Sequence, residues 1–461
     1  MKKMIATSLV LCMSVGMLAG CGSTSSSSSS DAGTATTESA SQEKAETSET
    51  SETSETGTTT VTLSVMDSYA SESPHGELIY QYADAFMAQN PEVKIDIQAI
   101  PSGDISTRIS AMATTPNDLP TMFFIPSDQA AIVHELGITE DLFQWVDEAT
   151  LDTFANGVVE SCMLEDEMVY FPVAVQPQGV IYRMDRFEEK GIEIPTTWQA
   201  FEDAAIALSE DTDGDGELDH WGFSMIGSNN SSGQSRFMSY LWSNGYEMVY
   251  HDGNQWATDL SVDPEFVEVF SKWTNMSLVH NAVPIGISEV DYPTAANYFA
   301  MGYTDMFLTG TNALGVAYAS NPDLEGKLGS FKLPGDYPGT LLGTEGYVVC
   351  GNASEAEKEA AVAYLTFINE NDPTQAFWQS SGKIPVTTEG QSVDFITGED
   401  YAGYLQQIED GCRDAVTFPG VGGLKTALGD AYAVAFSGEM TNEEAVAKLV
   451  KDVEELLTDY N

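Results

Sequence analysis

The chain has 461 residues, of which 18 are basic and 71 acidic, and its formal net charge at pH 7 is −53. This length is enough for two or three domains of ordinary size, and 42% hydrophobic residues predict that most of the chain folds around an apolar core. A surface this acidic repels phosphate backbones and anionic lipid headgroups, which excludes nucleic-acid binding and polybasic docking on a membrane.

The first 20 residues have the composition of a signal peptide. Lys2 and Lys3 precede an apolar run from Met4 to Leu18, which is too short to span a membrane. The run leads into Ala-Gly and Cys21, the pattern of a bacterial lipobox, in which the cysteine carries acyl chains such as palmitate. The alternative is an ordinary signal peptide followed by a chance cysteine. The lipobox predicts a protein held at the extracytoplasmic face of the cell membrane by its lipid anchor alone.

Residues 21–60 are expected to form a disordered tether behind the lipidated cysteine. Positions 22–60 hold 12 Ser, 11 Thr and 6 Glu but no aromatic residue and no Leu, Ile, Val or Met. Such a segment cannot bury enough apolar surface to offset the entropy lost on ordering. It therefore predicts a flexible connection between a lipid anchor and a folded body.

The cysteines predict neither a metal ribbon nor a disulfide framework. No two of the five form a CxxC pair, which argues against zinc ribbons and thioredoxin-type sites. The signal peptide and the lipobox account for two of them. The remaining three, Cys162, Cys350 and Cys412, are an odd number and cannot all pair within one chain.

From residue 61 onward, strand patterns alternate with helix patterns. Apolar alternation or continuous apolar runs predict strands at 61–65, 93–99 and 119–125. Helical spacing predicts helices at 78–86, 105–112 and 129–136. This order predicts a doubly wound sheet, in which ligands bind beyond the carboxyl ends of the strands. Those ends place Asp67, Ser127 and Asp128 on a ligand-facing rim, unless these residues simply form loops.

Later segments predict that the chain passes between two lobes. Strand-like pieces flank Gln176 and Pro177, whose proline interrupts a ladder, and a second crossing is expected near Pro338. Further helices are expected at about 198–209, 264–276, 293–301, 353–369, 423–436 and 442–457, with a strand at 342–350. We therefore expect an N-terminal lobe from 61–174 with 343–385 and a C-terminal lobe from 177–338 with 390–461.

A series of motifs, taken in order, resembles one family. They are the lipobox, Asp118-Leu-Pro-Thr-Met-Phe-Phe, Tyr170-Phe-Pro-Val-Ala, Ile181-Tyr-Arg-Met-Asp, Pro195-Thr-Thr-Trp and Leu218-Asp-His-Trp-Gly-Phe. Together they resemble the extracellular solute-binding lipoproteins of ABC importers, in the carbohydrate-binding group that includes maltose-binding protein. The resemblance covers residues 61–461. It implies a two-lobed α/β fold of the type II periplasmic-binding-protein kind, with a mostly parallel sheet flanked by helices in each lobe and a hinge between them.

The same resemblance implies which residues meet the ligand. Asp128 matches an aspartate that binds sugar hydroxyls, while Gln129 stands where the family protein has an arginine. Gln176 falls where that protein has a glutamate that contacts sugar, and Asn312 where it has a stacking tryptophan. These departures leave the particular sugar open.

Two further groups of residues are weaker candidates for ligand contact. Arg236, Phe237 and Trp242 fall where an aromatic contact is expected, although core packing is an equal alternative for the two rings. Gly422 and Gly423 precede a predicted helix, whose first amides are suited to binding a ligand unless the segment is a flexible loop.

An acidic loop is a candidate site for a structural calcium ion. Its oxygen ligands would be Asp211, Asp213, Asp215, Glu217 and Asp219. Their alternate spacing, with glycine in sixth place, matches the first half of an EF-hand loop. The twelfth position is Gly222 instead of the bidentate glutamate, so a solvated acidic turn is an equal alternative. No other cofactor is expected.

The sequence favours a binding protein over an enzyme. It contains no GxSxG, HExxH, P-loop or GxGxxG motif. We therefore expect a monomer that captures a sugar or oligosaccharide between its lobes and delivers it to the permease subunits of an ABC importer. The alternatives are a surface-anchored polysaccharide hydrolase, which needs only two carboxylates, and a cell-surface adhesin.

Overall fold

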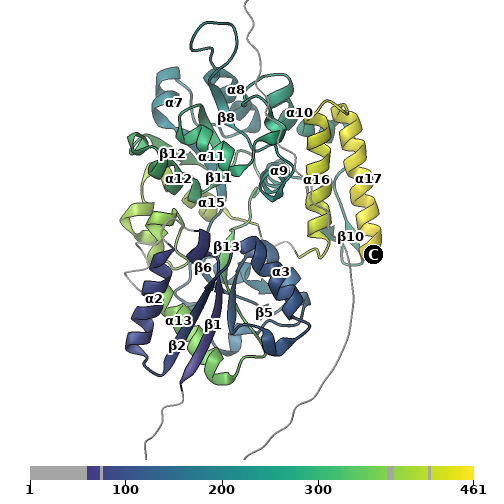
Figure 1. The fold of residues 1–461 in the computed structure, drawn as a ribbon. Helices are drawn as coiled ribbons and strands as arrows, with labels where there is room; N and C mark the ends of the chain where they lie inside the picture. Colours follow the sequence, from purple (N-terminus) through teal and green to yellow (C-terminus); the bar gives the residue numbers. More distant parts are fainter. Residues whose placement is uncertain (1–59, 73–75, 371–377, 414–416) are drawn as a thin grey trace, which may run out of the picture. The chain divides into compact units, whose positions relative to one another are not determined.

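A computed structural model describes residues 60–72, 76–370, 378–413 and 417–461. The predicted signal peptide, Cys21 and the tether up to residue 59 lie outside this part of the chain. Within it, two main sheets are flanked by helices, as the sequence predicts (Figure 1). No helix of the described part is long and apolar enough to cross a membrane.

The first sheet has the strand order β2-β1-β3-β13-β6. Its strands are β1 (Val61–Asp67), β2 (Val93–Ala99), β3 (Met122–Pro126), β6 (Phe171–Val175) and β13 (Thr344–Val349). β1 pairs in parallel with β2 and β3, whereas β13 runs antiparallel to both β3 and β6. The helices packed against it are α2 (Glu77–Gln89), α3 (Ser102–Met112) and α13 (Glu355–Glu370). We call this sheet with these helices the first lobe.

The second sheet has the strand order β12-β7-β11-β8. Its strands are β7 (Gln178–Arg183), β8 (Trp221–Ser224), β11 (Thr304–Gly310) and β12 (Leu328–Phe331). β7 runs antiparallel to β11 and β12, and β11 pairs in parallel with β8. Each sheet thus has one strand that runs against the others, β13 in the first and β7 in the second, so both are mixed sheets.

Helices from two parts of the chain surround the second sheet, and together with it they form the second lobe. They are α7 (Met184–Lys190), α8 (Trp198–Leu208), α9 (Ser231–Ser243), α10 (Pro264–Leu278), α11 (Tyr292–Ala300), α12 (Asn312–Ser320), α15 (Glu399–Asp410), α16 (Val421–Phe436) and α17 (Asn442–Tyr460). α16 and α17 lie side by side at one edge (Figure 1).

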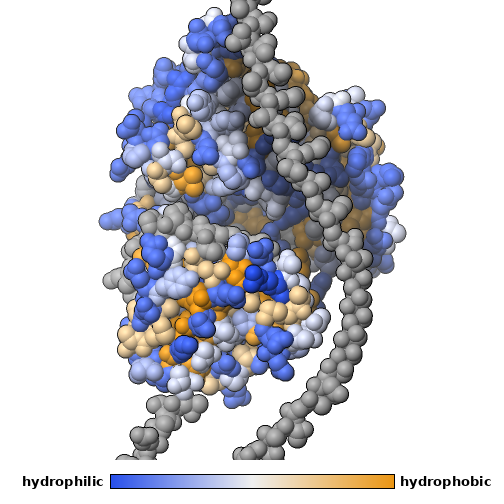
Figure 2. Space-filling model, viewed as in Figure 1, coloured by the Kyte–Doolittle hydropathy of each residue, from blue (hydrophilic) through white to orange (hydrophobic). Residues whose placement is uncertain are grey.

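Other short helices and two hairpins occur in the described part of the chain. They are α1 (Tyr69–Glu72), α4 (Ala130–Glu135), α5 (Glu148–Leu151), α6 (Val158–Ser161), and the hairpins β4–β5 (Met163–Leu164 and Glu167–Met168) and β9–β10 (Tyr250–His251 and Trp256–Ala257). Cys162, Cys350 and Cys412 are free thiols. Figure 2 shows hydrophilic residues over most of the visible face, with hydrophobic patches most evident over the first lobe.

The chain passes between the two sheets at several points. Gln176 and Pro177 join β6 of the first sheet to β7 of the second, and the segment from 332 to 343 leads back from β12 to β13. Gln176 therefore lies where the two lobes meet. Its position matters for function because a ligand between the lobes would lie beside this crossing.

Several elements have no counterpart among the expected ones. They include the helices α7, α9, α12 and α15 and the sheet strands β11 and β12. β11 reads Thr-Asp-Met-Phe-Leu-Thr-Gly and is buried at every position, so it lacks the alternation that marks a half-exposed strand.

Candidate ligand-binding site

A cavity of about 160 Å³ lies between the two lobes. We call it the interlobe cavity. The first lobe contributes Pro126, Ser127, Asp128, Thr344 and Glu345; the crossings contribute Gln176, Thr340, Leu341 and Gly343; the second lobe contributes Gln178, Ser235, Met238, Ser239, Trp242, Val421 and Lys425. Most of these side chains carry hydrogen-bonding groups, so the cavity suits a polar ligand.

Asp128 lies at the rim that the sequence predicted, directly after β3. The strand ends at Pro126, and a short 3₁₀ turn from Ser127 to Gln129 follows it. The Nζ of Lys425 donates to Oδ2 of Asp128 at 2.7 Å. Lys425 belongs to α16, so this ion pair joins the two lobes across the cavity. The side chain of Asp128 is 33% exposed and that of Lys425 is 15% exposed, so water or a ligand can replace either partner of the pair.

Gln176 forms a second polar connection at the crossing. Its Oε1 accepts from Nζ of Lys383 at 2.9 Å, and its Nε2 donates to Oδ1 of Asn312 at 3.2 Å. Lys383 also pairs with Glu345, which accepts from the hydroxyl of Tyr69 at 2.7 Å. The structure thus brings Gln176 and Asn312 together, as contacts of each other, with Gln176 on the cavity wall.

Asp67 is buried at the end of β1 and does not line the interlobe cavity. It is 1% exposed and accepts from the backbone N–H of Ala70 at 2.8 Å and from the hydroxyl of Tyr347. Burial raises its pKa, although these hydrogen bonds act in the opposite direction. These contacts give Asp67 a structural role at the end of β1.

The three candidates on α9 have different environments. Phe237 is completely buried, and its ring packs 5.7 Å from the ring of Phe270, so it belongs to the core. Arg236 donates to the backbone carbonyl of Ser232, and burial lowers the pKa of its guanidinium. Neither residue lines the cavity. Trp242 does, and its ring lies under the guanidinium of Arg413 at 4.9 Å.

The predicted glycine segment is part of a helix instead of a loop before one. α16 begins at Val421, two residues earlier than expected, so Gly422 and Gly423 lie in its first turn. A Cβ on Gly423 would meet the side chain of Leu456 at 2.8 Å, which shows that this glycine allows α17 to pack closely. The same helix reaches the interlobe cavity through Val421 and Lys425. Gln129, which follows Asp128, occupies the position before α4 and does not line the cavity.

Several residues of the cavity were not predicted from the sequence. Lys425, Glu345, Gln178, Ser235 and Ser239 all line it. A signal was available for Lys425, because it is the only basic residue in a helix otherwise rich in Ala, Gly and Leu. Glu345 was harder to predict. The sequence shows a carboxylate within an apolar strand, but it does not show which residues that carboxylate contacts.

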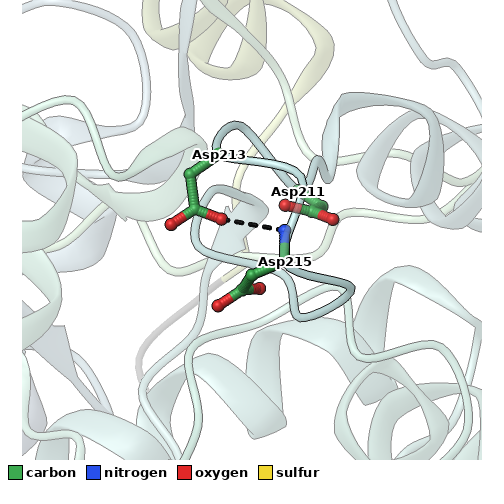
Figure 3. A group of neighbouring side chains, drawn as sticks. All are labelled: Asp211, Asp213 and Asp215. Atoms are coloured by element: carbon green, nitrogen blue, oxygen red, sulfur yellow. Dashed lines mark hydrogen bonds between the residues drawn. The ribbon is translucent and has the colours of Figure 1, made fainter.

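The acidic loop is an exposed turn held by its own carboxylates (Figure 3). Asp211 accepts from the N–H groups of Gly214 and Gly216 at 2.6 and 2.8 Å, and Asp213 accepts from Asp215 at 3.1 Å. One oxygen from each of these three aspartates lies within 4.8 Å of the others, a spacing that would allow them to hold one cation. Glu217 and Asp219 are not part of this group; Asp219 accepts from Thr212 at 2.9 Å and 2.7 Å.

The charges lining the interlobe cavity are balanced in pairs. Asp128 is matched by Lys425, and Glu345 by Lys383. The remaining polar groups are amides and hydroxyls, which both donate and accept hydrogen bonds. Such a lining favours an uncharged ligand with many hydroxyl groups over a charged one.

Two proteins with stated sugar ligands are similar to this chain over most of its length. The chain is 24% identical over 331 residues to the diacetylchitobiose-binding protein DasA of Streptomyces coelicolor, covering 71% of this chain and 73% of that protein. It is 22% identical over 388 residues to the xylose/arabinose-binding protein XacG of Haloferax volcanii, covering 79% of each.

Among solved structures, maltose-bound MalE3 of T. maritima matches with a TM-score of 0.73 and 19% identity, covering 86% of this chain and all of that one. This likeness confirms a periplasmic-binding-protein fold. The model of the family "Bacterial extracellular solute-binding protein" matches residues 81–402. That match spans well over half of the chain, and the protein therefore belongs to the bacterial extracellular solute-binding proteins.

Proposed function

We propose that the protein captures a sugar or oligosaccharide in the interlobe cavity and delivers it to the permease of an ABC importer. The observation that carries the proposal is the cavity itself, which is lined from both lobes by paired acceptors and donors and by one indole ring. Planar hydrogen-bonding groups suit sugar hydroxyls, and an aromatic ring suits the C–H face of a sugar.

The family consists of solute-binding proteins, so the chain is a binding protein and not an enzyme. Two relatives carry names that state sugar ligands, diacetylchitobiose in one case and xylose or arabinose in the other. These names support a carbohydrate ligand here, without selecting one, because the identities are below 25%.

Asp128 and Lys425 provide a mechanism for linking binding to closure. Each of the two ions has the other as its partner across the cavity. A sugar hydroxyl can donate to the carboxylate and accept from the ammonium, and so replace the direct ion pair by two bonds through the ligand. Only a ligand that binds the closed arrangement better than the open one shifts the population toward closure.

We infer the location of the protein from its N-terminal sequence. The lipobox at Cys21 would hold it at the outer face of the membrane, and residues 22–59 would give the folded part reach toward a permease in the same membrane. Both points rest on the sequence pattern of residues that the structure does not describe.

A thermal-shift screen tests the ligand class. The purified protein is melted in the presence of millimolar glucose, xylose, N-acetylglucosamine and their linear oligosaccharides, with amino acids and short peptides as comparison ligands. A ligand that binds only the folded state raises the melting temperature with concentration. We expect at least one carbohydrate to do so and the comparison ligands to have no effect. Stabilisation by amino acids or peptides alone would overturn the proposal.

A further inference from the structure

A second and larger pocket lies beside the interlobe cavity. Its volume is about 540 Å³. We call it the lateral pocket, and define it by Glu247, Tyr250, Trp256, Arg413 and Phe418. Met238 and Trp242 of α9 line both spaces, so their side chains form a shared wall.

Two other elements contribute to both spaces. On α16, Leu424 lines the lateral pocket and its neighbour Lys425 lines the interlobe cavity. At the crossing, the backbone N–H of Arg413 donates to the carbonyl of Thr340 at 2.8 Å. Thr340 lines the interlobe cavity and Arg413 lines the lateral pocket. The two spaces therefore adjoin at α9, at α16 and at the crossing.

The lateral pocket has the chemistry of a carbohydrate subsite. Tyr250 is 38% exposed although it is a large aromatic residue. Trp256 is partly exposed, and its position is fixed by ring contacts with His251 at 5.1 Å and with Phe418 at 5.0 Å. Rigid aromatic faces of this kind bind the C–H faces of sugar rings at a low cost in conformational entropy.

Polar groups stand next to these rings. The Nη2 of Arg413 donates to Oε1 of Glu247 at 2.6 Å, and the guanidinium lies over the ring of Trp242 at 4.9 Å. The charges of this pair cancel, and its remaining N–H groups and lone pairs can bind hydroxyls. The lateral pocket is thus suited to an uncharged polyhydroxylated group, as is the interlobe cavity.

The volumes of the two spaces indicate what size of ligand they would hold in combination. Pockets that enclose ligands of ordinary size measure roughly 300–1,000 Å³. The interlobe cavity, at about 160 Å³, is below this range, whereas the lateral pocket, at about 540 Å³, falls within it.

We infer that the lateral pocket is a second sugar subsite, and that the ligand is an uncharged oligosaccharide with one part in the interlobe cavity and the rest against Tyr250 and Trp256. This inference rests on the proposed function, because it names the length class of the sugar that the same site takes. One sugar unit meets Asp128 and Lys425, and the following units pass Trp242 to reach the rings of the β9–β10 hairpin.

Calorimetric titration with a length series tests the inference. The probes are glucose, xylose and N-acetylglucosamine, each beside its linear di-, tri- and tetrasaccharide. For the series that binds, we expect the tri- or tetrasaccharide to bind at least about tenfold more tightly than the monosaccharide. Trp256→Ala and Tyr250→Ala should each remove most of this gain and leave monosaccharide binding unchanged.

Two controls separate lost binding from lost folding. Tyr80→Ala removes an equally exposed tyrosine from α2 of the first lobe and should leave all affinities unchanged. The exposed Tyr250 is the safer of the two pocket variants, and melting curves without ligand verify that each variant folds. Equal affinity for monosaccharide and tetrasaccharide would overturn the subsite and leave the proposed function intact. No binding by any sugar of the three series would overturn both.

Discussion

At the residue scale, the ion pair of Asp128 and Lys425 shows how one contact has two uses. The pair satisfies both charges, since the two groups are 2.7 Å apart. Because both are partly exposed, their attraction contributes only about 0–1 kcal/mol to stability. The pair is therefore inexpensive to open, which suits a contact that a ligand must replace.

This argument predicts a specific loss in Asp128→Ala. Removing the carboxylate leaves a sugar hydroxyl without its acceptor in a closed cavity, which costs roughly 1–3 kcal/mol. We expect the affinity for the sugar found in the screen to fall by about tenfold to a hundredfold, measured by calorimetric titration. The melting temperature without ligand should change little, because the pair is partly exposed.

Asp96→Ala serves as a matched control, because Asp96 is an exposed carboxylate on β2 of the same lobe. Gln176→Ala should weaken sugar binding less than Asp128→Ala, since an amide accepts weaker bonds than a carboxylate. It should also lower stability without ligand, because Lys383 and Asn312 each lose a partner. If Asp128→Ala binds the sugar as tightly as the parent, Asp128 is not a ligand contact.

At the scale of single elements, α11 depends on one carboxylate at its start. The side chain of Asp291 accepts from the backbone N–H of Thr294 at 3.0 Å and so caps the helix. Hydrogen bonds from the hydroxyl and the backbone N–H of Thr294 lower the pKa of Asp291. α11 packs against β11, so the cap also affects how the second sheet is covered.

The cap predicts a pH-dependent loss of stability. Asp291→Ala should lower the free energy of unfolding by about 0.5–2 kcal/mol at pH 7, whereas Asp291→Asn keeps an acceptor and should cost less. The pKa of the folded state is lowered, so the advantage of Asp over Asn is complete above the ordinary pKa of 3.8 and is lost as the pH falls below it. Urea unfolding at pH 7 and pH 3 measures the difference. If the parent and Asp291→Asn differ in free energy of unfolding by the same amount at both pH values, the ionised carboxylate of Asp291 is not what stabilises the helix start.

The acidic loop between α8 and β8 is also an element with its own prediction. Asp211, Asp213 and Asp215 bring carboxylate oxygens within 4.8 Å of one another, and a divalent cation would relieve their repulsion. We expect millimolar calcium to raise the melting temperature and Asp213→Ala to abolish the rise. Glu217→Gln, outside the group of three, should retain it. Identical melting curves in calcium and in chelator would leave the loop as a solvated turn.

At the scale of the whole molecule, anchoring and folding are expected to be separable. Cys21 of the proposed lipobox is followed by a segment without large apolar residues, so we expect an anchor at this cysteine to contribute nothing to the apolar core. Cys21→Ala should therefore release the protein from membranes while its melting temperature and sugar affinity stay the same. Membrane fractionation of cells that express the variant measures the release. Continued association with the membrane would contradict the lipobox.

The sequence by itself determined much of the architecture and part of the site. Continuous or alternating apolar residues identified β1, β2 and β3, because burial of one or both faces of a strand leaves that pattern in any chain. The proline after Gln176 correctly indicated the end of a ladder and the crossing between the sheets. Asp128 was placed at the rim because it directly follows a buried strand, a relation that depends only on neighbouring residues.

Only the tertiary structure decided how the remaining site residues are used. Lys425 lies 297 positions from Asp128, and Lys383 lies 207 positions from Gln176, so no local pattern could pair them. Phe237 and Trp242 read alike in the sequence, yet packing buries the first in the core and sets the second on a wall between two pockets. The physical reason is that periodicity reports which face of an element is buried, whereas a binding site depends on what the opposite lobe places against that face.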